Sequence, residues 1–391
     1  MSAASVARSV FTADLPTGRL TLTIESSRQP VEDLLGFAAR ANPRRAFLFL
    51  SKILGKHYPV RPADMAATHR ALAEDVPTAD GPVVFIGMAE TATGLGQGVF
   101  EAWIAAHPEM QALYLQTTRY RVDQAQRLDF DEAHSHAPRV FVHLPTDPDS
   151  LGMFATARLV VLVDDELSTG NTFVNLVAVL RKEMPSLAGV HLATLADFMG
   201  ATRRLELGAV MGLPCSVGAL MRGSWQFENN GATVAATAAQ CAEGHEVSLT
   251  DAGYGRLGRK RRLFASAELV STLRAEAVSG TTLVLGTGEF MHPAFVLGRA
   301  LEAAGLDVRV QATTRSPILC WGAVRNALAV PDPYHEGIPN FVYNVSPGQY
   351  ARVLICHETA PDATLFELAR LLEARLIHFQ PDDHAEEVPV C

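Results

Sequence analysis

The stretch from Val160 to Phe173, VVLVDDELSTGNTF, contains the pattern that decides the fold. Val160–Val163 is an apolar run long enough for a buried strand, and Asp164 and Asp165 follow it directly. Ser168–Thr172 then forms a turn of small polar residues, after which apolar residues recur at the spacing of a helix. The stretch therefore predicts a strand, an acidic pair, a short loop and the start of a helix.

This order of elements is typical of a site for a phosphorylated sugar. The backbone N–H groups of the loop and the positive end of the helix dipole can hold a phosphate. The carboxylates of Asp164 and Asp165 can accept hydrogen bonds from sugar hydroxyls, directly or beside a hard cation. The loop residues that we expect around the phosphate are Ser168, Thr169, Gly170, Asn171 and Thr172.

The composition indicates a globular protein of two domains. The chain has 391 residues, of which 48% are hydrophobic and 19% charged, enough for a sizeable core. A net charge of −9 argues against a general nucleic-acid binder. The apolar runs are too short to cross a membrane, and the N-terminal residues lack the apolar core of a signal peptide. Five scattered cysteines without CxxC spacing favour reduced thiols in a cytoplasmic protein.

Strands alternate with helices along the chain, which predicts an α/β fold with parallel sheets and ligands at the carboxyl ends of the strands. The predicted strands are Arg19–Glu25, Val83–Ile86, Ala112–Gln116, Val140–Leu144, Val160–Val163, Val190–Leu195, Cys215–Leu220, Thr281–Leu285, Val308–Ala312, Phe341–Val345 and Val353–Cys356. The predicted helices are Val31–Ala41, Ala63–Asp75, Gln97–Ala106, Ala201–Leu207, Ala294–Ala304 and Leu365–Leu376, besides the one that begins near Phe173.

Two further loops have the composition of anion sites. The strand Val83–Ile86 runs into small residues that include Ala89, Glu90 and Thr91 before a helix begins. In the second half, a strand runs into Gly286–Phe290 (GTGEF), and Arg315 follows the next strand as a charged clamp. Tight turns without a ligand use the same residues, so both readings stay open.

The segment Thr117–Pro138 is long and polar and lacks apolar periodicity, which is typical of a functional lid. It contains Arg119, and it contains His134 and His136 two residues apart. This spacing is compatible with metal ligands, but it is commoner in surface loops and substrate contacts.

A change of composition marks the predicted domain boundary. Gly231–Arg262 is first rich in alanine and then rich in glycine and basic residues, among them Arg256. A solvated linker face accounts for this basic cluster, and a polyanion site is the alternative. We therefore expect a first domain at residues 1–262 and a smaller α/β domain at residues 263–391.

The VVLVDDELSTGNT segment resembles the phosphoribosyl-pyrophosphate (PRPP) signature of type I phosphoribosyltransferases, in particular the orotate enzymes. The second half contains Thr314-Arg315-Ser316-Pro317, which resembles the motif that names the TRSP domain. That domain follows an orotate-phosphoribosyltransferase-like domain in proteins associated with tellurium-resistance gene clusters. The resemblance covers nearly the whole chain and implies a parallel sheet flanked by helices, an N-terminal hood and a TRSP-like α/β domain.

The resemblance also implies roles for individual residues. Asp164 and Asp165 would contact the ribose hydroxyls and lie at the Mg²⁺ ion, and Ser168–Thr172 would hold the 5-phosphate. Ala89–Thr91 would lie at the pyrophosphate, and Thr117–Pro138 would close over it. Orotate enzymes carry a catalytic lysine in this lid, whereas this segment has none. Its candidate replacements are Arg119, Arg121, His134 and His136.

Three functions are compatible with these features. The first is Mg²⁺-dependent transfer of a 5-phosphoribosyl group from PRPP to a nitrogenous base or related acceptor, with release of pyrophosphate. The second is a PRPP-binding regulator or scaffold without turnover, since the lid lacks its lysine. The third is cleavage of a nucleotide-like compound. The expected partners are PRPP and a small-molecule base, with no nucleic acid and no membrane, and a homodimer is compatible with the sequence.

Overall fold

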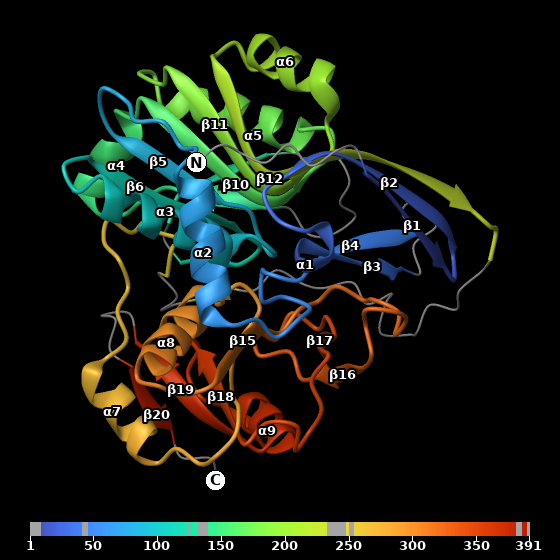
Figure 1. The fold of residues 1–391 in the computed structure, drawn as a ribbon. Helices are drawn as coiled ribbons and strands as arrows, with labels where there is room; N and C mark the ends of the chain where they lie inside the picture. Colours follow the sequence, from blue (N-terminus) through green and yellow to red (C-terminus); the bar gives the residue numbers. More distant parts are fainter. Residues whose placement is uncertain are drawn as a thin grey trace.

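The computed structural model describes residues 9–40, 46–123, 125–130, 140–232, 248–249, 254–380 and 385–388. It confirms the predicted α/β class and shows a large sheet with its helices above a smaller α/β unit (Figure 1). No helix of these residues is long and apolar enough to cross a membrane.

The large sheet has a parallel centre and antiparallel edges. In the described residues its strand order is β1-β2-β12-β11-β10-β5-β6-β9-β8. Strands β12, β11, β10, β5 and β6 run parallel, whereas β2 is antiparallel to β12 and β9 is antiparallel to β6. The strands are β1 (Ser9–Leu15), β2 (Gly18–Ser27), β5 (Val83–Gly87), β6 (Ala112–Thr118), β8 (Arg127–Asp129), β9 (Phe141–His143), β10 (Leu159–Leu167), β11 (Gly189–Asp197) and β12 (Cys215–Asn229).

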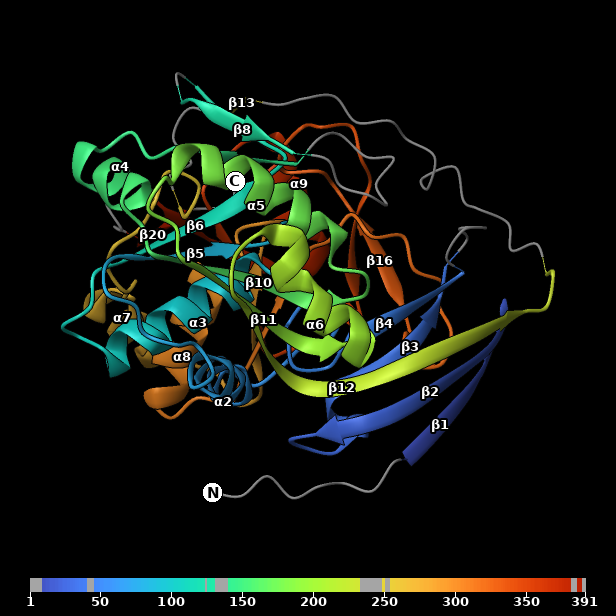
Figure 2. The ribbon, with the colours of Figure 1, turned by 90° about the horizontal axis from the view of Figure 1, so that it is seen from above.

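Helices cover both faces of this sheet, which is why its central strands are continuous apolar runs rather than alternating ones. All residues of β5 and β6 are buried. Helix α3 lies on the face toward the smaller unit with α2 beside it, and α5 and α6 lie on the opposite face (Figures 1 and 2). The helices of this part are α1 (Val31–Leu34), α2 (Pro62–Ala73), α3 (Thr93–Ala106), α4 (Pro148–Ala155), α5 (Asn171–Glu183) and α6 (Gly200–Met211).

A separate hairpin stands beside the antiparallel edge, in the part of the chain where we expect the N-terminal hood, and is called the hood below. It consists of β3 (Leu35–Ala39) and β4 (Phe47–Ser51), which are antiparallel. Aromatic residues join this hairpin to the sheet edge: the ring of Phe47 packs against Trp225 and Phe227 of β12 at centroid distances of 4.8 and 4.9 Å. A short pair, β7 (Arg121–Val122) with β13 (Ser248–Leu249), lies apart from the main sheet.

The smaller unit is built around a second, mostly parallel sheet. In the described residues its order is β15-β14-β18-β19-β20, with β20 antiparallel to β19. The strands are β14 (Thr282–Gly286), β15 (Val308–Ala312), β18 (Arg352–His357), β19 (Ala374–Phe379) and β20 (Ala385–Val388), and a hairpin adds β16 (Ala327–Val330) and β17 (Asn340–Tyr343). The helices are α7 (Ala267–Ala275), α8 (His292–Ala303) and α9 (Ala363–Leu372).

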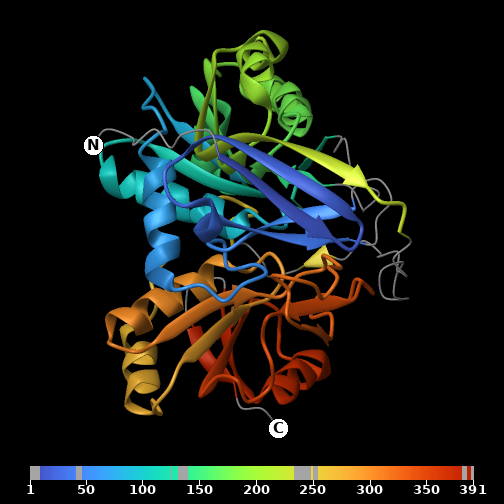
Figure 3. The ribbon, with the colours of Figure 1, turned by 45° about the vertical axis from the view of Figure 1, so that its right-hand side comes forward.

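The two units meet over a broad interface (Figures 1 and 3). Helix α8 packs against α2 and α3. The chain between the units also joins the first sheet: Tyr114 and Arg259 exchange backbone hydrogen bonds of 2.8 and 2.9 Å, and Gln116 donates to the Gly255 carbonyl at 2.8 Å. Leu263 lies in the core of the second unit. The predicted boundary after residue 262 stays a prediction.

Two helices and the environment of one arginine differ from the predictions. The helix predicted for Val31–Ala41 is only one turn long, because the following Leu35–Ala39 pairs with β4 instead. The helix predicted for Leu365–Leu376 ends at Leu372, since Glu373 takes a left-handed conformation (φ 51°) and β19 then begins. The arginine is Arg256, which is fully buried rather than part of a solvated linker face.

Candidate functional site

The predicted donor site lies at the carboxyl ends of two neighbouring parallel strands whose connections lead to opposite sides of the sheet. Strand β5 leads through α3 to β6 on one side, and β10 leads through α5 to β11 on the other. Such a reversal of strand order opens a crevice at the carboxyl ends of the two strands, the usual ligand site of this sheet type. The last residue pair between them is Val163 with Gly87, and Met88 N–H donates to the Val163 carbonyl at 2.9 Å.

The acidic pair extends from β10 into this crevice. Asp164 follows the last pair with β5 and is still in register with Thr194 of β11. Asp164 and Asp165 are half-buried, and the Asp165 N–H donates to Asp164 Oδ1 at 2.9 Å. Carboxylates in this position can accept hydrogen bonds from ligand hydroxyls because they are held by a strand yet partly open to water.

The predicted phosphate loop is held in shape by a glycine and an arginine. Gly170 is the N-cap of α5 with φ 72°, and a Cβ there would lie 3.1 Å from Leu207 Cδ2 and 3.2 Å from Met199 Sδ. Arg203 of α6 donates to the Thr169 carbonyl at 2.9 Å and to Asn171 Oδ1 at 2.8 Å. Ser168 and Thr172 are half-buried, so the loop and the first turn of α5 stay open to a ligand.

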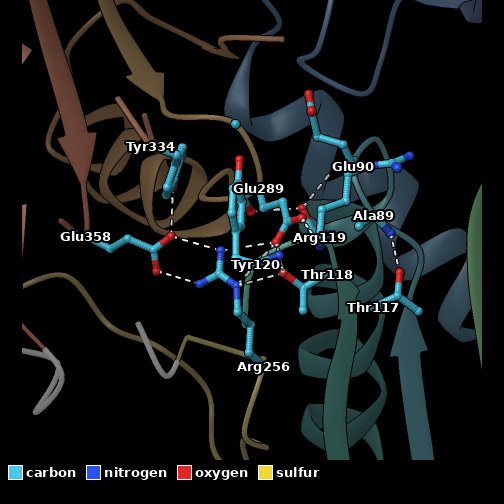
Figure 4. A network of polar contacts seen from close by, with 12 residues as sticks. Ala89, Glu90, Thr117, Thr118, Arg119, Tyr120, Arg256, Glu289, Tyr334 and Glu358 are labelled. Carbon is cyan, nitrogen blue, oxygen red and sulfur yellow. Dashed lines mark hydrogen bonds and ion pairs between the residues drawn. The ribbon is translucent and has the colours of Figure 1, made fainter. Parts of the chain in front are cut away.

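The loop after β5 lies beside the acidic pair. The peptide bond between Ala89 and Glu90 is cis. Ala89 N–H donates to Thr117 Oγ1 at 2.7 Å, so this loop is tied to the end of β6 (Figure 4). Ala89, Glu90 and Thr91 are each half-buried. The structure therefore brings the predicted pyrophosphate segment to the same sheet edge as the acidic pair.

Glu90 is held by two cations from distant parts of the chain. Its Oε1 contacts Nζ of Lys56, which follows the hood, and its Oε2 accepts from Arg315 Nε at 2.9 Å. Burial by itself raises the pKa of the Glu90 carboxyl, but Lys56 and Arg315 hold that pKa well below its usual range. Glu90 therefore carries its negative charge at neutral pH.

The first part of the predicted lid is interior. Thr117 and Thr118 belong to β6 and are fully buried, as is Tyr120. Thr118 and Tyr120 contact Glu289 and Glu336 of the second unit. The Arg119 N–H donates to Glu289 Oε1 at 3.1 Å. The lid prediction is thus wrong for residues 117–120, and Arg119 lies in the interface. His134 and His136 lie outside the described residues.

A second buried network joins the two sheets at Arg256 (Figure 4). Its guanidinium lies 2.8 Å from Glu358 Oε2 and 3.1 Å from Glu289 Oε2. Glu358 also accepts from Tyr334 OH at 2.7 Å, and Glu289 accepts from Thr118 Oγ1 at 2.7 Å. Burial lowers the pKa of Arg256, but the two carboxylates outweigh it and raise that pKa. Through Glu289, the GTGE turn therefore holds both Arg256 and β6.

Several residues of these networks are not predicted from the sequence. Glu336 accepts from Arg315 Nη1 at 2.7 and 2.6 Å and from Tyr120 OH at 3.1 Å. Glu358 ends the apolar strand β18 much as Asp164 follows an apolar run, and that parallel is a signal in the sequence. The partner of Lys56 lies 34 residues away, so this pairing leaves no local pattern in the sequence.

The carboxylates at the predicted donor site fit a loosely held Mg²⁺ ion. Within the described ranges, no three His, Cys, Asp or Glu side chains cluster closely enough to hold a metal by themselves. Asp164 and Asp165 nevertheless supply carboxylate oxygens, which Mg²⁺ prefers. Mg²⁺ commonly keeps several waters and binds through one or two carboxylates together with substrate phosphates.

Two family models match this chain in the two units described above. Residues 34–224 match the model of a phosphoribosyl transferase family, and residues 253–374 match that of the TRSP domain found C-terminal to it. The chain belongs to this phosphoribosyltransferase family with a C-terminal TRSP domain. The resemblance in the sequence is thereby confirmed, and the first unit is its phosphoribosyltransferase domain. No curated protein matches the chain.

Solved phosphoribosyltransferases are similar to the first domain. Adenine phosphoribosyltransferase from Trypanosoma brucei, in complex with AMP, pyrophosphate and ribose-5-phosphate, is 13% identical with a TM-score of 0.34, over 50% of this chain and 82% of that one. Orotate phosphoribosyltransferase from Francisella tularensis is 16% identical with a TM-score of 0.29, over 48% and 82%. Because these scores are low, the assignment rests on the family models.

Proposed function

We propose that this protein transfers a 5-phosphoribosyl group from PRPP to a nitrogenous base or related acceptor and releases pyrophosphate. The observation that supports this most is the meeting of an acidic pair and a phosphate loop at the β5/β10 crevice of a phosphoribosyltransferase domain. A nitrogen of the acceptor forms a bond to C1 of the ribose while the bond from C1 to the pyrophosphate oxygen breaks. The acceptor nitrogen gives up its proton where it carries one.

Each part of the crevice has a role in this proposal. Asp164 and Asp165 bind the ribose hydroxyls, and the loop Ser168–Thr172 binds the 5-phosphate at the start of α5. The segment Ala89–Thr91 binds the pyrophosphate. In an oxocarbenium-like transition state, positioning and neutralisation of the leaving group are the main tasks of the protein. A Mg²⁺ ion held at Asp164 and Asp165 would neutralise phosphate charge when bound.

A screen for pyrophosphate release tests the proposal. The full-length protein is incubated with PRPP, Mg²⁺ and a panel of bases, and the Asp164→Asn/Asp165→Asn variant is the control. Release with at least one base in the wild type, lost in the variant, is the expected result. A folded wild type that neither binds PRPP with Mg²⁺ in calorimetry nor releases pyrophosphate with any base would overturn it.

A second candidate is PRPP binding without turnover. It is favoured by the predicted lid, Thr117–Pro138, which has no lysine and whose first residues are buried in the interface. PRPP binding in calorimetry without pyrophosphate release across the panel of bases favours this regulator. In either case we propose small-molecule partners rather than nucleic acid or membrane, a cytoplasmic location, and a homodimer as the assembly to test first.

A further inference from the structure

The inference concerns the ion-paired carboxylate of Glu90 and rests on the proposed pyrophosphate position. Three segments far apart in sequence meet at this side chain: the loop after β5, the residues after the hood, and the TRSP motif after β15. Lys56 Nζ and Arg315 Nε contact its two oxygens separately. Glu90 thus places one anionic group between two cations at the carboxyl end of β5.

Burial of these three charged side chains costs free energy, and their ion pairs compensate only part of it. The side chain of Lys56 is 1% exposed, and those of Glu90 and Arg315 are each 10% exposed. Removing charges from water costs several kcal/mol per ion unless their geometry compensates, and apolar residues often stabilise such a position equally well. Buried charge clusters in a crevice are therefore candidates for function.

The Glu90 carboxylate lies where the proposed reaction places the anionic pyrophosphate. The Glu90 backbone belongs to the loop that lies beside the acidic pair of β10. Glu336 also binds Arg315, and Lys56 Nζ lies 3.4 Å from the Gly288 carbonyl, so both cations keep a partner if Glu90 moves away. Glu90 and Arg315 are the most exposed members of the trio, so the trio is nearest to solvent at these two side chains.

We propose that Glu90 is an internal placeholder for pyrophosphate, which displaces its carboxylate and binds Lys56 and Arg315. The hood and the TRSP domain would then each supply one cation to the leaving group, in place of a lid lysine. Pyrophosphate can bind only those molecules in which the placeholder has moved away. The apparent affinity is therefore the intrinsic affinity multiplied by the fraction of such molecules. It also keeps two buried cations paired when no ligand is present.

The test is binding of inorganic pyrophosphate, without PRPP or base, in metal-free buffer. Glu90→Ala removes the placeholder, and we expect it to bind pyrophosphate at least about tenfold more tightly than the wild type. Adding Arg315→Met to Glu90→Ala should abolish this gain. Glu101→Ala is the matched control, since Glu101 is another interface carboxylate, paired with His292 at 2.9 Å. It should bind pyrophosphate as the wild type does.

Equal or weaker binding by Glu90→Ala would overturn the inference, as would a similar gain in Glu101→Ala. If Glu90→Ala folds poorly, Glu90→Gln takes its place with the same expected gain and the same criterion. The outcome is separable from the proposed transfer, because pyrophosphate binding needs no turnover. Tighter binding by Glu90→Ala together with no release from PRPP would support the placeholder and reject the transferase. Release from PRPP without tighter binding by Glu90→Ala would support the transferase and reject the placeholder.

Discussion

Arg256, in the chain between the two sheets, and Glu358, which follows β18, form a bidentate ion pair, with Nη1 2.8 Å from Oε2 and Nη2 3.0 Å from Oε1. Their side chains are 1% and 0% exposed. The guanidinium also pairs with Glu289, in the turn after β14. One arginine therefore neutralises two carboxylates that follow strands of the TRSP domain.

Arg256→Met should destabilise the protein strongly. It leaves Glu289 and Glu358 without their cation in a dry interface, and loss of one partner of a buried pair costs about 3–5 kcal/mol. Urea unfolding measures this change. Arg309→Met is the control, because Arg309 pairs with a half-exposed Asp307 and such pairs contribute about 0–1 kcal/mol. Equal losses in the two variants would contradict the role assigned to Arg256.

Gly170→Ala should weaken both the phosphate loop and the fold. The left-handed conformation of Gly170 costs other residues about 1–2 kcal/mol, and the added Cβ would press on Leu207 and Met199. We expect a lower melting temperature and weaker PRPP binding in calorimetry. Gly152→Ala in α4 is the control: its Cβ would meet nothing within 4 Å, and alanine favours helices by up to about 1 kcal/mol. Unchanged PRPP affinity in Gly170→Ala would contradict the proposed role of Ser168–Thr172 as the phosphate loop.

Stability should fall as the pH falls below the usual pKa of histidine. Burial lowers the pKa of His69 and of His57 to about 3 in the folded protein. The unfolded chain therefore binds more protons between about pH 6.5 and 3, so the free energy of unfolding rises with pH across this window. His69→Phe, which keeps a ring against Phe295, should flatten urea-unfolding profiles by up to about 1.4 kcal/mol per pH unit. An unchanged slope would contradict this.

The proposed domains should associate tightly when produced as separate chains. Residues 1–262 carry Glu90 and Arg256, whereas their partners Arg315 and Glu358 lie in residues 263–391. Co-expressed halves should copurify through size-exclusion chromatography, and Arg315→Met with Arg256→Met should separate them. Halves that fold and never associate would contradict a permanent interface.

The fold was largely predictable because its signals are local. Apolar runs such as Val160–Val163 and Val83–Ile86 predict buried strands, and the structure has buried strands there. Val31–Ala41 failed because pairing with a strand further along the chain overrode its helical pattern. The acidic pair and the phosphate loop were likewise predictable, because Asp164–Thr172 is one continuous segment.

The site could be predicted only in part because its partners are distant. Arg315 contacts Glu90 across 225 positions of sequence, and no local periodicity reports such a pair. Thr118 and Tyr120 follow a strand and precede polar residues, so their segment was interpreted as a lid. Only the packing of the TRSP domain against β6 shows that these two side chains are interior.

The contact of Lys56 and Arg315 with Glu90 has a consequence for how the protein matures. Lys56 and Glu90 belong to one domain, whereas Arg315 comes from the TRSP domain. The loop after β5 therefore gains its second cation only when the two domains dock. A newly made chain would complete this group of charges only after Arg315 has been synthesised, so that a product truncated before that residue would lack one of the two cations.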